Sequence, residues 1–448
     1  MKNLFGTDGI RGRAGEFPLD ESTVTAIGRS LAQQYKAELG KVPRFATGRD
    51  TRESGASIER AFHAGARDAG AECQSSGIIT TPGVAFVTKH FGFDAGIVIS
   101  ASHNPYDDNG LKIFAPDGKK VGEGIERAIE SDLRKADAEA KVLNEVDTDD
   151  SKAVVFQDAY AEHLAAEFNG SRLDGFRMVI DCANGAASHM APELFRRLGA
   201  EVIAFNDRPD GRNINKDCGS LHLEHLQSRV VSEKVHFGVA FDGDADRALF
   251  VDEKGSIVDG DATLWIMAQF LRDKGGLANN IVVATVMSNI GLEIALASTG
   301  LTLIRTAVGD KYVLDELIKT RSELGGEQSG HVIFPKESLV GDGMMTALFM
   351  LEAINAKARP FSEMVKGFTR YPQVLINVKV REKQPFENVT EISEAARQIE
   401  DELDRKGRLL LRYSGTENLA RVMIEGKDQA DIERQANSLA DVIRATLG

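Results

Sequence analysis

Short apolar runs alternate with amphipathic stretches along most of the chain, and this alternation restricts the fold more than any other feature. We predict buried strands at residues 95–100 (AGIVIS), 178–181 (MVID), 237–241 (FGVAF) and 281–285 (IVVAT). We predict helices at residues 191–198, 262–274 and 344–354. Strands that alternate with helices form parallel or mixed sheets with helical cover. The sequence therefore predicts an α/β protein.

The length of 448 residues predicts three or four domains, because a single hydrophobic core rarely grows so large. A polar stretch at residues 135–152 ends the first predicted domain, and the turn at 252–255 (DEKG) is a seam. The last unit combines a predicted strand at 374–380 with an amphipathic helix at 428–447. The predicted domains are residues 1–150, 151–252, 253–370 and 371–448.

Charge and cysteine content exclude several protein classes. The formal net charge of −14 disfavours nucleic acid as a partner, because nucleic-acid binding requires basic patches. Cys73, Cys182 and Cys218 form no CxxC pair, which is typical of a reducing compartment. The start of the chain lacks the apolar run of a signal peptide, and no stretch has the roughly 18–20 apolar residues of a membrane span. We expect a cytoplasmic protein with no membrane partner.

A loop rich in polar residues follows the predicted strand at 95–100. It reads SASHNPYDDNG, with Ser102 and His103 adjacent and Lys112 ten residues after the serine. Strand ends of this kind carry catalytic groups in α/β folds. A serine hydroxyl becomes a nucleophile when a base or a cation activates it. The alternative is an ordinary turn, since Ser, Asn, Asp and Gly also favour turns.

Three aspartates occupy alternate positions after the strand at 237–241. Asp242, Asp244 and Asp246 repel one another unless a cation joins them, and carboxylate oxygens suit Mg²⁺. An EF-hand is the specific alternative, but its glycine position holds Arg247 and the flanks are predicted strands. A solvated acidic turn is the other alternative. The adjacent Arg247 favours a metal site that also binds phosphate.

A glycine-rich loop at residues 324–331 reads LGGEQSGH. It has the glycine spacing of a P-loop, but His331 stands where the P-loop lysine must be, so the spacing does not indicate nucleotide binding. In an extended segment Glu327 and Ser329 would share a face and could bind neighbouring sugar hydroxyls. The alternative is a plain glycine turn with a structural histidine.

The last loop, residues 412–418 (RYSGTEN), has Arg421 just beyond it. Its hydroxyls and backbone N–H groups can form an anion-binding nest, to which Arg412 adds a bidentate phosphate ligand. A plain hairpin turn is the alternative. Together the four loops supply a nucleophile, a metal site, a polyol site and a phosphate site, which is the set required for phosphoryl transfer to a sugar.

Five segments in this order resemble the α-D-phosphohexomutase superfamily over essentially the whole chain. They are FGTDGIRG (5–12), ISASHNP (99–105), DGDADR (242–247), GGEQSGH (325–331) and SGTE (414–417). The resemblance implies three mixed-sheet α/β domains and a smaller C-terminal α+β domain around a central cleft. It also implies an isomerase in which Ser102 carries a phosphoryl group, donates it to a sugar monophosphate and recovers the other phosphoryl from a 1,6-bisphosphate.

The resemblance also implies a role for each motif residue. One Mg²⁺ per subunit would be bound by Asp242, Asp244, Asp246 and an oxygen on Ser102. Arg11, Lys112 and Arg247 would stabilise charge, His103 would shape the serine loop, and His331 is a candidate proton carrier. The residues implied in substrate binding are Asp310, Lys311, Glu327, Ser329, Arg412, Ser414, Gly415 and Thr416.

Three features resemble the branch of this superfamily that acts on glucosamine phosphates: the opening GTDGIRG, Gln328 in the sugar loop, and Asp310 within VGDKYV. The implied reaction interconverts glucosamine 6-phosphate and glucosamine 1-phosphate for UDP-N-acetylglucosamine synthesis, with glucosamine 1,6-bisphosphate as intermediate and activator. The partner is then a hexosamine phosphate, and a homodimer is one candidate assembly.

Two places depart from that branch: Lys311 stands where Arg is commoner, and Tyr413 and Asn418 stand where Pro is frequent. The second departure puts the rigidity of the phosphate loop in question, because proline restricts the backbone. The nearest alternative function is a phosphomannomutase or phosphoglucomutase. A metal-dependent sugar phosphatase and an inactive sugar-phosphate-binding protein are more distant alternatives.

Overall fold

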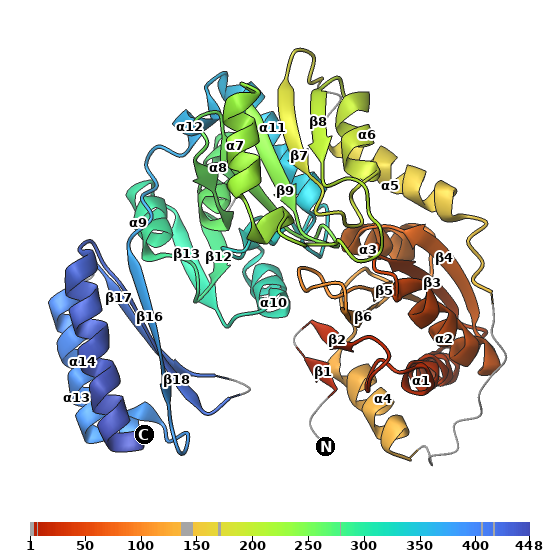
Figure 1. Cartoon of the computed structure of the whole chain (residues 1–448), viewed down its shortest axis with the longest axis horizontal. Coiled ribbons are helices and arrows are strands. Elements are labelled where there is room, and N and C mark those ends of the chain that lie inside the picture. Colours follow the sequence, from red (N-terminus) through yellow and green to blue (C-terminus); the bar gives the residue numbers. More distant parts are fainter. Residues whose placement is uncertain are drawn as a thin grey trace. The chain divides into compact units, whose positions relative to one another are not determined.

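The structure is a computed structural model that describes residues 4–6, 8–135, 147–168, 172–277, 279–404, 406–414 and 417–448. The strands of these residues form four sheets (Figure 1). By their contacts the residues fall into two compact units, Met1–Thr285 with Ile304–Lys366, and Val286–Leu303 with Gly367–Gly448. The first unit contains the first two sheets and most of the third, and the second unit contains the fourth.

The first sheet has six strands in the order β1-β2-β6-β5-β3-β4. Their bounds are β1 Phe5–Gly6, β2 Gly9–Arg13, β3 Arg44–Arg49, β4 Glu72–Ile78, β5 Ala95–Ile99 and β6 Asp108–Phe114. The sheet is mixed, because β3 runs parallel to β4 and β5 whereas β6 is antiparallel to β5 and β2. Its helices are α1 Glu21–Leu39, α2 Gly55–Asp68, α3 Thr81–His90 and α4 Glu123–Lys135.

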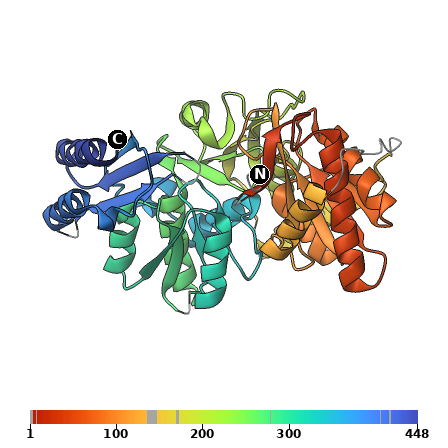
Figure 2. The ribbon, with the colours of Figure 1, turned by 90° about the horizontal axis from the view of Figure 1, so that it is seen from below.

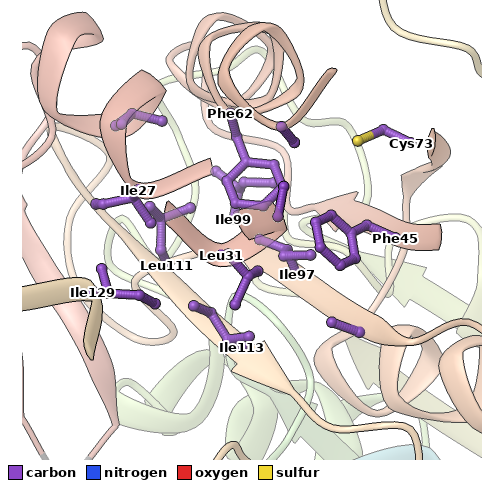
Figure 3. Packing of buried hydrophobic residues seen from close by; sticks show 14 of the residues in the cluster. Ile27, Leu31, Phe45, Phe62, Cys73, Ile97, Ile99, Leu111, Ile113 and Ile129 are labelled. Atoms are coloured by element: carbon purple, nitrogen blue, oxygen red, sulfur yellow. The ribbon is translucent and has the colours of Figure 1, made fainter. Parts of the chain in front are cut away.

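The core of this sheet lies on the face that α1, α2 and α4 cover. Figure 3 shows Ile27 and Leu31 of α1, Phe62 of α2 and Ile129 of α4 beside strand residues such as Ile97. All five side chains are fully buried. Helix α3 covers the other face against β3 and β5, so the layers are helix, sheet and helix. Asp20 caps the start of α1 by accepting from Thr23 N, and Gly40 ends it in a left-handed conformation.

The second sheet has the order β11-β10-β9-β7-β8. Its strands are β7 Arg177–Asp181, β8 Glu201–Phe205, β9 Phe237–Phe241, β10 Ala248–Asp252 and β11 Ile257–Val258, and its helices are α5 Ala153–Glu167, α6 Met190–Arg197 and α7 Glu224–Ser232. Strands β9 and β10 form an antiparallel hairpin. Because β11 pairs with β10, this sheet continues beyond residue 252, where we placed the seam.

The third sheet has the order β13-β12-β14-β15. Its strands are β12 Ile281–Thr285, β13 Thr302–Thr306, β14 Gly325–Gly326 and β15 Val332–Ile333. The helices from this stretch of the chain are α8 Gly260–Asp273, α10 Asp310–Thr320, α11 Gly343–Lys357 and α12 Phe361–Met364 in the first unit, and α9 Ile290–Ser298 in the second. Asp259 caps α8 and Asp342 caps α11, each through a backbone N–H of the first turn.

The fourth sheet has three antiparallel strands in the order β16-β18-β17, namely β16 Gln373–Lys379, β18 Leu419–Glu425 and β17 Arg408–Tyr413. Helices α13 Thr390–Leu403 and α14 Gln429–Leu447 lie together on one face of it, as Figures 1 and 2 both show. Val422 and Ile424 of β18 pack there against Leu439 and Ile443 of α14.

The prediction of α/β sheets followed by a smaller α+β unit is confirmed. The strands predicted from apolar runs appear as β5, β7, β9, β12 and β16, and the predicted helices appear as α6, α8, α11 and α14. The four domain boundaries stay a prediction, as does the central cleft. In the part of the chain that the structure describes, every helix is too short or too polar to cross a bilayer.

Candidate active site

The loop after β5 holds Ser102 in a left-handed backbone conformation with φ of 54°. Such a conformation costs about 1–3 kcal/mol and persists where the surroundings enforce it. Ser102 N donates to Ser100 Oγ at 2.9 Å, and the Ser102 carbonyl oxygen accepts from Asn215 Nδ2 at 2.9 Å and from Arg52 Nη2 at 3.2 Å. Side chains from two other loops therefore fix the orientation of this serine.

The hairpin turn between β9 and β10 places the three aspartates together, as predicted. One oxygen from each of Asp242, Asp244 and Asp246 lies within 4.8 Å of the others, and all three residues are buried. Ser102 Oγ donates to Asp242 Oδ2 at 2.6 Å, which brings the first loop onto the second. The flanking elements are strands, so the EF-hand alternative is wrong.

The charges of this triplet are compatible with a divalent metal. Burial and the neighbouring Asp246 and Asp244 raise the pKa of Asp242 well above its usual range. Among the described residues, Asp244 Oδ1 and Asp246 Oδ1 have no hydrogen-bond partner although both are buried. Buried carboxylate oxygens without donors are costly unless a cation binds them, so these residues fit a metal centre.

Lys112 is a fixed positive charge beside the triplet. Its ammonium lies 2.9 Å from Asp244 Oδ2 and 3.2 Å from Asp246 Oδ2, and its side chain is 1% exposed. Burial lowers the pKa of Lys112, but Asp244, Asp246 and Asp8 raise it well above the usual range. Lys112 therefore keeps its proton and can stabilise negative charge on a phosphoryl group.

Two arginines also lie near the serine loop. Arg11 contacts Asp8 at 2.5 Å and Asn104 Oδ1 at 3.5 Å, while Arg247 Nε lies 3.8 Å from Asp246 Oδ1. Among the described residues, the Nε groups of Arg11 and Arg247 are buried without hydrogen-bond partners. Guanidinium donors of this kind can bind phosphoryl oxygens.

The two candidate histidines differ in environment. His103 Nδ1 lies 3.3 Å from Ser102 Oγ, and burial, Arg247 and Arg11 lower its pKa to about 4. His103 is therefore neutral at neutral pH. His331 Nδ1 lies 3.6 Å from Asp246 Oδ1, and Gly341 N donates to His331 Nε2 at 3.1 Å. Burial lowers the pKa of His331, but the carboxylates of Asp246, Asp310 and Glu327 raise it overall. The hydrogen bond from Gly341 N favours a ring that carries no proton on Nε2.

The glycine-rich loop is a tight turn between β14 and β15 and not the extended segment we considered. Gly330 N donates to Glu327 O at 3.0 Å, and Glu327 N donates to His331 O at 2.9 Å. Glu327 and Ser329 nevertheless meet, because Ser329 Oγ lies 3.3 Å from Glu327 Oε2. Gly309 N donates to Glu327 Oε1 at 3.1 Å and orients this carboxylate.

Asp310 and Lys311 point to different partners although they are adjacent. Asp310, the first residue of α10, accepts from Lys120 Nζ at 2.6 Å. Lys311 Nζ lies 3.2 Å from Glu123 Oε1 on the surface of α4. The structure therefore joins Asp310 to the charged groups of the site, whereas the Lys311 side chain pairs with a surface carboxylate.

The phosphate loop of the second unit has an excess of positive charge. Arg412 of β17 lies opposite Arg421 of β18 in the antiparallel register, and like charges in such a pair repel. Arg421 Nε is buried without a hydrogen-bond partner among the described residues, and Lys383 Nζ donates to Ser414 O at 2.6 Å. Gly415 and Thr416 lie outside the described residues. The cluster Arg412, Arg421 and Lys383 suits an anion.

Sequence reasoning missed five residues that the structure brings into these sites: Asp8, Lys120, Thr81, Asn215 and Lys383. Asp8 belongs to a motif that we quoted, but nothing marked its carboxylate as a partner of Lys112. Thr81 Oγ1 donates to Asp244 Oδ2 at 2.6 Å, although the two residues are 163 positions apart in the sequence. Contacts of this separation leave no local pattern in a single sequence.

Comparison with known proteins shows the family of this chain. Models described as phosphoglucomutase/phosphomannomutase match residues 2–140 (alpha/beta/alpha domain I), 158–255 (domain II), 259–371 (domain III) and 375–442 (C-terminal domain). The phosphoglucosamine mutase of Solibacter usitatus strain Ellin6076 is 47% identical over 447 residues, covering 100% of this chain and 99% of its own. That of Koribacter versatilis strain Ellin345 is 44% identical over 458 residues, covering 100% and 98%.

The fold also resembles that of solved structures. A phosphoglucomutase/phosphomannomutase family protein from Burkholderia thailandensis superposes with a TM-score of 0.80 at 24% identity, covering 99% of this chain and 98% of its own. At this identity the likeness establishes a shared fold.

Proposed function

Because this chain belongs to the phosphoglucomutase/phosphomannomutase family and, within it, to the phosphoglucosamine mutases, we propose that it interconverts glucosamine 6-phosphate and glucosamine 1-phosphate through a phosphoserine at Ser102. The observation that carries the proposal is the 2.6 Å contact of Ser102 Oγ with Asp242 in a buried carboxylate triplet beside Lys112. The free, buried thiols of Cys73, Cys182 and Cys218 support a cytoplasmic location.

Asp242, Asp244 and Asp246, with an oxygen on Ser102, would hold one Mg²⁺. When bound, this ion supplies positive charge that stabilises the phosphoryl group in the transition state. Lys112, Arg247 and Arg11 supply the remaining positive charge from side chains.

Two transfers make up the reaction. In the first, the bond between Ser102 Oγ and phosphorus breaks while a sugar hydroxyl oxygen bonds to phosphorus, which gives glucosamine 1,6-bisphosphate. The hydroxyl proton leaves to a base, for which His331 is the candidate: burial lowers its pKa, but the carboxylates of Asp246, Asp310 and Glu327 raise it overall and so favour the protonated ring that results. In the second, after the bisphosphate has turned, Ser102 Oγ loses its proton and bonds to the other phosphorus while the bond between that phosphorus and its sugar oxygen breaks, and the sugar oxygen takes up a proton. Free bisphosphate acts as activator by phosphorylating Ser102 in the same way.

Glu327 and Ser329 would bind sugar hydroxyls. Their side chains meet at 3.3 Å, and Gly309 N holds the Glu327 carboxylate, so a substrate hydroxyl can donate to an oriented acceptor. A charge-assisted bond of this kind contributes about 1.5–3 kcal/mol. Arg412, Ser414, Gly415 and Thr416 would bind the phosphate that is not reacting, and Arg421 and Lys383 would add charge.

Sugar preference tests the proposal directly. Glucosamine 6-phosphate, glucose 6-phosphate and mannose 6-phosphate are compared as substrates, each with a trace of its own 1,6-bisphosphate. We expect the highest kcat/KM for glucosamine 6-phosphate, by about tenfold or more, since one well-placed polar contact changes discrimination by this amount. A higher kcat/KM for mannose or glucose phosphate would assign the chain a different sugar.

Arg412→Ala distinguishes a mutase from a phosphatase. Loss of a bidentate phosphate contact should raise KM about tenfold, because charge-assisted hydrogen bonds contribute about 1.5–3 kcal/mol. The bisphosphate should also escape more often before it turns, so the variant should release more 1,6-bisphosphate per turnover and depend more on added bisphosphate.

Arg434→Ala is the matched control, because Arg434 lies on the surface of α14 and pairs with Asp431. This control should match the parent enzyme. If Arg412→Ala also matches the parent in both KM and bisphosphate release, the loop is a plain turn.

A further inference from the structure

Lys120 joins two carboxylates from distant parts of the first unit. Its ammonium lies 2.5 Å from Asp8 Oδ1 and 2.6 Å from Asp310 Oδ2, and its side chain is only 17% exposed. Asp8 lies in the turn between β1 and β2, and Asp310 begins α10. Burial lowers the pKa of Lys120, but Asp310 and Asp8 raise it above its usual value, so the amine is charged.

The first of these carboxylates, Asp8, contacts two cations near the reacting centre. Asp8 Oδ2 lies 3.2 Å from Lys112 Nζ and 2.5 Å from Arg11 Nη2. Lys112 in turn contacts Asp244 and Asp246. A change in the position of Asp8 therefore moves the two cations that face the phosphoserine loop.

The second carboxylate, Asp310, lies beside residues of the sugar loop. Asp310 Oδ1 accepts from Lys311 N at 2.9 Å while Oδ2 accepts from Lys120, so donors of the chain engage both oxygens. His331 Nε2 lies 3.8 Å from Asp310 Oδ2. The preceding residue, Gly309, holds Glu327 through its N–H.

These contacts close a circuit in which acidic and basic side chains alternate. It runs from Asp246 to Lys112, Asp8, Lys120, Asp310 and His331, and the 3.6 Å contact between His331 Nδ1 and Asp246 Oδ1 closes it. Without the Lys120 ammonium, Asp8 and Asp310 would face each other as like charges with little water to screen them. The two carboxylates would move apart, and the sugar loop would move relative to Lys112.

We propose that Lys120 is a positioning residue. It holds Asp310 and Glu327, which lie at the sugar loop, at a fixed distance from Lys112, which lies beside the aspartate triplet. It binds neither the substrate nor the metal ligands and acts through Asp8 and Asp310. In this view Asp310 contributes to sugar binding indirectly, because its carboxylate is held by Lys120. This inference rests on the proposed mutase function.

The experiment is a double-mutant cycle in the full-length protein with Lys120→Met, Asp310→Asn and the combined variant. The readouts are kcat and KM for glucosamine 6-phosphate with its bisphosphate, and the midpoint of thermal unfolding. Lys119→Met is the matched control, since Lys119 is the adjacent residue, is 38% exposed at its side chain, and pairs with Asp117 at the surface. Lys120→Gln replaces Lys120→Met if the latter does not fold.

We expect Lys120→Met to lower kcat about 10-fold to 100-fold, with a smaller change in KM, because small misplacements of reacting groups cost up to about 100-fold. Lys119→Met should match the parent. The factor by which kcat falls in the combined variant should be about tenfold smaller than the product of the factors for the two single variants. The reason is that removing the Asp310 charge relieves the repulsion that Lys120→Met creates.

Three results would overturn parts of this account. If the parent enzyme is active and Lys120→Met matches it in kcat, the inference about Lys120 is wrong, while the proposed function stands. Single losses that multiply in the combined variant would overturn it too, because they would show that Lys120 does not act through Asp310. A parent enzyme with no mutase activity on any hexose phosphate would overturn the proposed function and this inference with it.

Discussion

Ser102→Ala is expected to lose turnover by a factor on the order of 10⁴ or more, because it removes the hydroxyl that we propose carries the phosphoryl group between the two transfers. The hydroxyl lies 2.6 Å from Asp242, and the Ser102 carbonyl oxygen accepts a hydrogen bond from Asn215 Nδ2. Peptide mapping of the parent enzyme should find phosphate on Ser102, and the variant should carry none there.

Two further variants make this result unambiguous. Ser102→Gly also lacks the hydroxyl but tolerates the left-handed backbone, whose φ is 54°, so it separates loss of the nucleophile from backbone strain. Ser57→Ala is the control, because Ser57 is exposed on α2 of the same sheet and should leave activity unchanged. Substantial turnover in either Ser102 variant would exclude this residue as the phosphoryl carrier.

Removal of divalent metal is expected to lower activity roughly 100-fold or more, because a bound cation contributes several kcal/mol of charge stabilisation. Dialysis against a chelator should stop the reaction, and Mg²⁺ should restore it. Asp244→Asn should weaken the response to Mg²⁺, since it removes one negative charge from a triplet whose oxygens lie within 4.8 Å of one another.

Thermal unfolding gives a second readout that does not depend on activity. Mg²⁺ that binds the native state should raise the unfolding midpoint of the parent, and less so that of Asp244→Asn. Asp174→Asn is the control, because Asp174 is an exposed acid that pairs with Arg172. If chelation changes neither the activity nor the midpoint of thermal unfolding, the triplet does not bind a metal.

The local chemistry of the site followed from the sequence. The serine loop and the aspartate triplet each follow a strand that its apolar residues predicted, namely β5 and β9. The glycine-rich loop instead includes the short β14, a strand that the sequence did not predict. Polar residues directly after a buried strand must lie at the edge of a sheet, because the strand fixes where the chain emerges. This is why Ser102 and Asp242 could be named before their 2.6 Å contact was known.

Sequence pattern was insufficient wherever orientation mattered. The Lys311 side chain pairs with Glu123, and its expected role in substrate binding stays a prediction. Glu327 and Ser329 meet through a turn and not along an extended segment. The direction of a long side chain depends on which neighbours pack beside it, and that information is absent from the local sequence.

The sequence by itself determined the α/β class, the positions of the reactive loops and the residue types that each loop presents, because these depend on hydrophobic periodicity and on chemistry within a few positions. Only the tertiary structure decided how the loops meet. Asp8 lies 112 positions and Asp310 lies 190 positions from Lys120 along the chain, yet one ammonium binds both carboxylates. Such a contact arises from the packing of separate sheets in one unit, and no periodicity in the chain encodes it.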